Sequence, residues 1–201
     1  MATVPEATPQ ERLLRYNNGA VLLHWLTALI VVAQVIVGFT FAGMERGPAR
    51  GDLFTVHKTI GATILVLALM RLGWRLVHPP PPFPTELPRW ERIASVWTHR
   101  AFYVLLILLP LTGLMAVSGG ASAEGKTSTA LLGGIPLPLI PGVSDDAGEA
   151  IGGIHELLVF VTLALLVLHV AAALKHQIER QRAAGRMPPF RAPGEDPHPS
   201  P

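Results

Sequence analysis

Four long apolar segments dominate this sequence and restrict the chain to few folds. They cover residues 20–42, 53–77, 95–118 and 150–174, and each has roughly the 20 apolar residues that a helix needs to cross a bilayer. Charged residues make up 15% of the chain, against about a quarter in soluble domains, and the mean hydropathy is +0.41. The sequence therefore predicts an all-α, integral membrane four-helix bundle. The first segment is expected to remain as a span, because no small-residue cleavage site follows it.

The distribution of Lys and Arg predicts the orientation. Twelve of the 16 basic residues lie in the N-terminal arm, around the connection between the second and third spans, and near the C-terminus. Only four lie on the opposite side. Cytoplasmic segments carry the excess of Lys and Arg, so both termini are predicted to be cytoplasmic. The net charge of +2 is explained by this topology, and no nucleic-acid partner is expected.

The same pattern suggests a division of the chain. We expect a cytoplasmic arm over residues 1–15, one four-span domain over 16–180, and a disordered cytoplasmic tail over 181–201. The segment "HPPPPFPTELP" (78–88) predicts a stiff cytoplasmic connection, because its prolines prevent a continuous helix. The segment "GGIPLPLIPG" (133–142) is too short and too broken to span, and should either lie along the outer interface or cover the mouth of the bundle.

Two histidines stand at opposite ends of the fourth apolar segment. His155 and His169 are 14 residues apart, close to four full helical turns, so both project from one face. The helical rise separates them by about 21 Å, one near each side of the hydrocarbon layer. Ionisable residues within a membrane are functional candidates by default.

Two further histidines match these depths. The first span runs outward, so His24, near its start, shares the inner depth of His169. The second span runs inward, so His57, near its start, shares the outer depth of His155. The four intramembrane histidines therefore form two pairs, one on each side of the membrane.

Two imidazoles at each depth predict a haem at each depth. Zinc usually takes four ligands, or three and a water molecule, and each pair supplies only two strong ones. Haem iron receives four nitrogens from its porphyrin and needs only two axial ligands. The chain has no cysteine, which excludes iron–sulfur clusters and the C-x-x-C-H attachment of c-type haem. We therefore expect two haem b groups, with iron held by His24 and His169 on the inner side and by His57 and His155 on the outer side.

Cations near the histidines are candidate partners for the haem propionates. Lys58 would serve on the outer side, and Arg71 and Arg75 on the inner side. Snorkelling anchors at the membrane surface are an equally good interpretation of these three residues. Small residues within the spans would let a macrocycle or a neighbouring helix approach closely; these are Gly38, Gly61 and Gly113.

His99 and His176 lie at the cytoplasmic ends of the third and fourth spans. Either is a candidate donor to a quinone carbonyl or a proton relay. The alternative interpretation is an ordinary polar residue at the membrane interface.

Several stretches of the sequence resemble the bacterial cytochrome b561 family, whose members are related to the b-type subunits of nickel hydrogenases. These are "LLHWLTA", "VHKTIGATILVLALMRLGWR", "HRAFYVLLILLPLTGL", "IHELLVFVTLALLVLHVAAALKH" and "GRMPPF", in this order. The resemblance implies axial ligation by His24, His57, His155 and His169. It also implies a quinone pocket beside the inner haem, near His176, and a location in the bacterial inner membrane. The long outer loop "SAEGKTSTALLGGIPLPLIPGVSD" departs from the family pattern.

These features predict electron transfer between a periplasmic redox partner and membrane quinone. In the resembling family, one activity is oxidation of superoxide with reduction of ubiquinone, and Arg46, Arg50 and Lys58 would attract that anion to the outer side. An alternative is an anchor subunit for a larger dehydrogenase or hydrogenase. A non-haem metal transporter is the alternative from another class, but it should carry acidic residues within its spans, and none lies in their interior.

Overall fold

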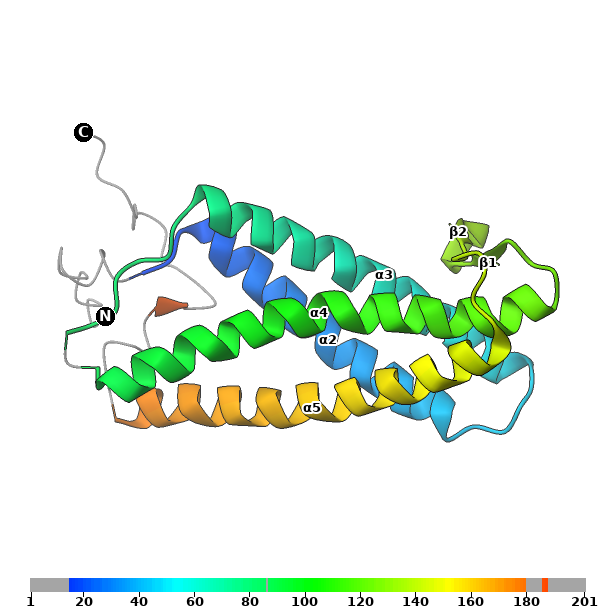
Figure 1. Ribbon diagram of the computed structural model, residues 1–201. Helices are drawn as coiled ribbons and strands as arrows, with labels where there is room; N and C mark the ends of the chain where they lie inside the picture. Colours follow the sequence, from blue (N-terminus) through cyan, green and yellow to red (C-terminus); the bar gives the residue numbers. More distant parts are fainter. Residues whose placement is uncertain (1–14, 86, 180–185, 188–201) are drawn as a thin grey trace, which may run out of the picture.

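The computed structural model describes residues 15–85, 87–179 and 186–187, and its main feature is a bundle of four long helices (Figure 1). The helices are α2 (Asn18–Ala42), α3 (Pro48–Val77), α4 (Arg89–Ala123) and α5 (Asp145–Ile178). Two short strands, β1 (Ser128–Ala130) and β2 (Pro136–Pro138), and a 3-10 turn, η1 (Leu132–Gly134), lie between α4 and α5.

All four helices are long and apolar enough to cross a membrane. Their outward faces carry large apolar side chains, such as Leu29 on α2 and Leu168 on α5, which are 69% and 66% exposed. Such continuous apolar surface is unfavourable in water and is matched by lipid. The predicted membrane-crossing bundle is confirmed.

The ends of the four helices gather at two opposite ends of the bundle (Figure 1). The start of α2, the connection from α3 to α4 and the end of α5 lie together at what we call the inner end. The loop from α2 to α3 and the two strands lie at the opposite, outer end. That the inner end faces the cytoplasm stays a prediction.

Local signals fix where the helices begin. The Asn17 side chain accepts a hydrogen bond from Ala20 N (2.9 Å), and also from Trp74 Nε1 on α3 (3.0 Å). Ser144 caps α5 in the same way through Ala147 N. Asn17 therefore both starts α2 and ties it to the inner end of α3.

The helices pack in chain order, α2 on α3, α3 on α4 and α4 on α5. Ile64 and Ala68 of α3 and Leu106 of α4 form the buried centre. At the outer end α4 and α5 approach so closely that a Cβ added at Gly119 would lie 2.7 Å from the Cα atom of Gly148. Small residues at this crossing allow the two backbones to touch.

The outer loop adds a small element that the sequence did not predict. β1 and β2 pair antiparallel, with Thr129 opposite Leu137, and they are the only strands in the described part of the chain. The hairpin is tied to α3 by two bonds, from Lys58 Nζ to Thr129 Oγ1 (2.5 Å) and from Leu132 N to Thr59 Oγ1 (2.9 Å). Thr129, Ala130 and Leu137 of the hairpin line the space between the helices at the outer end, and which of the two expected arrangements the segment takes at a membrane stays a prediction.

Most of the arm and tail predicted from the sequence, residues 1–14, 181–185 and 188–201, lies outside the described residues. Arg186 is described and buried, lying against the rings of Tyr16 (5.3 Å) and Phe83 (4.6 Å). It also donates to the carbonyls of Pro81 and Pro82, and burial lowers the pKa of its guanidinium. Cation–π contacts and two carbonyls thus hold Arg186 against the connection between α3 and α4, and the disorder predicted for the tail stays a prediction.

A candidate cofactor site between the helices

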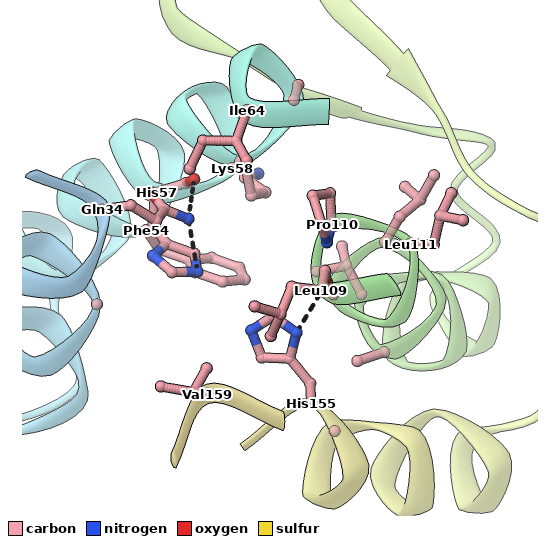
Figure 2. Close-up of a pocket in the computed structure, with 18 of the residues that line it drawn as sticks. Gln34, Phe54, His57, Lys58, Ile64, Leu109, Pro110, Leu111, His155 and Val159 are labelled. Atoms are coloured by element: carbon pink, nitrogen blue, oxygen red, sulfur yellow. Dashed lines mark hydrogen bonds between the residues drawn. The ribbon is translucent and has the colours of Figure 1, made fainter. Parts of the chain in front are cut away.

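A cavity of about 960 Å³ lies between the four helices toward the outer end, beneath the hairpin. Its lining is mostly apolar, but His57 of α3 and His155 of α5 face it from opposite sides (Figure 2). The centroids of these two imidazoles are 6.4 Å apart, and the ring planes cross at 81°. The structure thus brings together the two histidines to which the sequence assigned the same outer depth.

The orientation of His155 is fixed by helix α4. Its Nδ1 lies 2.9 Å from the carbonyl oxygen of Leu109 and 3.2 Å from Thr112 Oγ1. A neutral imidazole that donates from Nδ1 keeps a lone pair on Nε2. His155 is therefore held in the tautomer in which Nε2 can bind a metal ion.

The surroundings of His57 differ, because its partner is a side-chain amide. Gln34 of α2 donates from Nε2 to the carbonyl oxygen of His57 (3.1 Å), and the same nitrogen lies 3.3 Å from His57 Nε2 (Figure 2). His57 Nδ1 and Gln34 Oε1 are both buried, and neither has a hydrogen-bond partner among the described residues. Gln34 was not among the residues predicted from the sequence, although an amide inside the apolar run "VVAQVIV" is a recognisable signal.

Two of the glycines singled out in the sequence lie against the outer imidazoles. A Cβ at Gly38 would lie 3.2 Å from His57 Cε1, and one at Gly113 would lie 3.2 Å from His155 Cε1. Gly61 faces the Gln34 amide instead, at 3.3 Å. These glycines make room for the two rings and for the amide.

A second cluster of histidines lies closer to the inner end. The rings of His24 on α2 and His169 on α5 have centroids 6.3 Å apart, and the planes cross at 61°. The ring of His99 on α4 lies 5.6 Å from that of His169, and its Nδ1 donates to Ser95 O (2.7 Å). His99 is therefore next to the inner pair, whereas the sequence placed it only at the end of a span.

The basic residues singled out in the sequence, as propionate partners or as cations that would attract superoxide, have different surroundings. Lys58 lines the outer cavity, whereas Arg46 and Arg50 do not, and Arg50 bonds to the Phe41 carbonyl oxygen (3.1 Å). Arg71 reaches the inner pair, with Nη2 3.3 Å from His24 Nδ1. The last of the set, Arg75, lies over the Tyr103 ring, as Arg71 also does.

A further basic residue, Lys126, also lines the cavity at the hairpin. It is bonded to Glu124, and this bond lowers the pKa of that exposed carboxyl. Of the two lysines, Lys126 is thus bonded to a carboxylate, whereas the bond described for Lys58 is to the Thr129 hydroxyl.

His176 lies at the inner end of α5, beside a carboxylate that the sequence analysis did not single out. Its Nε2 is 3.8 Å from Glu91 Oε2 on α4, and Lys175 donates to Glu91 Oε1 (2.7 Å). Glu91 is only 9% exposed, which is rare for a carboxylate unless it is paired.

The distance between the two rings of each histidine pair fits a metal ion that the two imidazoles bind from opposite sides, with its other ligands supplied by a cofactor. A metal–imidazole bond is about 2 Å long, so rings on opposite sides of one ion have centroids about 6 Å apart. Both pairs are close to this separation. No group of three or more His, Cys, Asp or Glu side chains in the described part of the chain could hold a metal ion. Two axial imidazoles and an apolar space between helices are an arrangement suited to haem.

Comparison with known proteins agrees with this geometry. The family model described as prokaryotic cytochrome b561 matches residues 15–189. Cytochrome b561 homolog 2 of Escherichia coli (strain K12) is 27% identical over 182 residues, which cover 86% of this chain and 90% of that protein. The "Probable superoxide oxidase CybB" of Yersinia pestis is 26% identical over 163 residues, covering 81% of this chain and 88% of that protein. The family match spans nearly the whole bundle, and this membrane protein therefore belongs to the prokaryotic cytochrome b561 family.

Proposed function

We propose that this protein is a di-haem b-type cytochrome that transfers electrons between an outer-side redox partner and membrane quinone. One haem b is assigned to His24 and His169, and the other to His57 and His155. The observation that carries the proposal is the separation of 6.3 Å and 6.4 Å between the rings of the two pairs. Membership of the cytochrome b561 family supports b-type haem as the group bound.

Bound haem supplies reversible one-electron chemistry at iron, and the chain sets its ligation and surroundings. His155 presents Nε2 because Leu109 holds its Nδ1. Lys58 is the outer candidate for a propionate, since its ammonium already donates to the Thr129 hydroxyl at the cavity. Arg71 is the inner candidate, and a carboxylate would be a stronger partner for its guanidinium than a neutral imidazole. Arg75 is a weaker candidate because it lies against Tyr103.

We assign the quinone site to the inner end of the bundle, which we place at the cytoplasmic side of the membrane. Quinone reduction takes two electrons and two protons, so its site needs groups that can supply protons. His176 is close to a buried carboxylate, and His99 lies next to the inner histidine pair. We assign His176 to the quinone carbonyl or to proton delivery, with His99 as the second candidate, and ubiquinone as one of the quinones to test.

The proposal is tested by quantifying haem per chain in the purified protein and titrating its spectrum against potential. Two b-type haems per chain, with two reduction steps, are expected. A colourless protein, or one whose haem survives loss of the four histidines, would contradict the assignment. A non-haem metal transporter would be colourless, so the same measurement separates the two classes.

Superoxide is the outer reductant that we favour. The name of the Yersinia pestis relative suggests oxidoreductase activity toward superoxide, and the cation Lys58 at the cavity mouth suits a small anion. Each superoxide would lose one electron and leave as O2, and two such electrons with two protons would convert a quinone to a quinol. In stopped-flow mixing, superoxide should reduce the oxidised protein faster than a dismutation control; no reduction above that control would remove superoxide from the proposal.

An anchor subunit for a larger dehydrogenase is the alternative within the same class. Copurification from solubilised membranes distinguishes an independent cytochrome from an anchor subunit, since a stoichiometric partner dehydrogenase would favour the anchor role. The haem content is expected to be the same in both cases.

A further inference from the structure

We propose that Gln34 is the positioning residue of the outer haem site, and that its amide oxygen accepts the Nδ1–H of His57 when that ring binds iron. This inference rests on the proposed function, because it assigns a role toward a bound haem. It concerns a residue of α2, which supplies no ligand to the outer pair.

The surroundings of Gln34 limit what its amide can do. The side chain projects from an apolar stretch of α2, where an unpaired amide is costly. Among the described residues, both of its hydrogen bonds go to one residue, His57: to the carbonyl oxygen at 3.1 Å and to ring Nε2 at 3.3 Å. Gly61 leaves the space that this amide needs, since a Cβ there would lie 3.3 Å from Gln34 Nε2. The amide is therefore fitted to His57 and to no other described side chain.

The two buried atoms without partners are chemically complementary. Gln34 Oε1 can only accept, and His57 Nδ1 carries the proton when Nε2 accepts from the amide. A half turn of the ring about its Cβ–Cγ bond exchanges Nδ1 with Cδ2, the neighbour of Nε2, and so brings Nδ1 to the side of Gln34. The same turn moves Nε2 away from the amide. The amide nitrogen, a donor, faces the ring, so the amide must also make a half turn. The two turns together free Nε2 for iron and place Oε1 against the Nδ1–H, in exchange for the bond from Gln34 Nε2 to the His57 carbonyl oxygen.

The opposite histidine shows the same principle with a different acceptor. His155 Nδ1 already lies 2.9 Å from the carbonyl oxygen of Leu109. A histidine that binds a metal almost always donates its other N–H to a carbonyl, carboxylate or water, which fixes the ring and raises its basicity. For His57 that acceptor is a side chain, so it can be changed by substitution.

The expected effects of two substitutions have opposite signs. Gln34→Leu removes the acceptor, makes the imidazole less basic, and should raise the reduction potential of the outer haem. Gln34→Glu supplies a carboxylate acceptor, makes the imidazole more basic, stabilises ferric iron, and should lower that potential. A role in packing alone would not produce shifts of opposite sign.

The experiment uses the full-length haem-loaded protein in detergent. Haem per chain, the two reduction potentials and the low-temperature EPR spectrum of the ferric form are measured for each variant. His155→Ala, expected to lack the outer haem, identifies which reduction step belongs to it. Thr40→Val is the matched control, because Thr40 is on the same helix, is exposed, and among the described residues its hydroxyl bonds to Ile36 O of its own helix.

A raised outer potential in Gln34→Leu and a lowered one in Gln34→Glu, with the inner step unchanged, would support the inference. Loss of the outer haem in Gln34→Leu alone, with Gln34→Glu retaining it, would also support it, since losing this kind of partner weakens metal binding by about 10- to 100-fold. Shifts of the same sign, unchanged potentials, or loss of the outer haem from both variants would overturn it. If the unsubstituted protein holds no outer haem, the proposed function itself fails, which is a different result.

Discussion

The contact between Gly119 and Gly148 gives a sharp test of how the outer end of the bundle is assembled. A methyl group at Gly119 would lie 2.7 Å from the Cα atom of Gly148 and 2.8 Å from the carbonyl oxygen of Ser144. Both neighbours are backbone atoms, one of α5 and one of Ser144, which caps it, so no side chain can rotate away. Gly119→Ala must therefore push α4 and α5 apart near the helix turn that leads to His155.

The expected loss of stability combines two opposing effects. Overpacking of a tight contact costs about 1–3 kcal/mol, and more when only backbone can yield. Replacing glycine by alanine within a helix contributes up to about 1 kcal/mol in the opposite direction. We expect a net destabilisation of about 1–2 kcal/mol, which lowers Tm by about 2–8 °C for a chain of this size.

The neighbouring residue supplies the control. Gly120 is exposed, and a Cβ there would have no atom within 4 Å. Gly120→Ala should therefore gain the helix contribution without the clash and raise Tm by about 1–4 °C. Thermal unfolding of the two variants is followed by circular dichroism in one detergent. Equal Tm values, or a Gly119→Ala protein as stable as the unsubstituted one, would show that the helices do not touch there.

Replacing His24 or His169 with Ala should remove the inner haem and leave most of the outer one, measured by haem content and spectrum; equal loss of both haems would contradict the pairing. Gly113→Ala places a methyl group 3.2 Å from the His155 ring, so it should weaken outer haem binding by about 10-fold in a haem titration, and unchanged binding would show that the ring has room. His176→Ala should slow quinone reduction while the absorption spectrum stays intact, and unchanged turnover would exclude it from the quinone site. Protease added to sealed, right-side-out cells should not cut the connection 78–88, and cleavage there would reverse the proposed topology.

In helix α2, the span and the position of His24 along it could be predicted from the sequence, but the contact made by Gln34 could not. The apolar run that contains His24 predicts a span, and hydrogen bonds within one helix then fix the depth of each residue along it. The same run contains Gln34, but nothing near it in the chain shows what the amide contacts. Its partner, His57, is 23 residues away on another helix. The assignment of the four histidines to iron stays a prediction, although their rings do meet in pairs.

The sequence by itself determined the number of spans and the depth of each histidine, because both follow from helix rise and bilayer thickness. Only the tertiary structure decided which side chains meet between helices: Glu91 with Lys175, Lys58 with the hairpin, and Gln34 with His57. These contacts depend on how each helix is rotated and how two helices cross. Rotation and crossing are set by packing between residues far apart in the chain, so no local pattern encodes them.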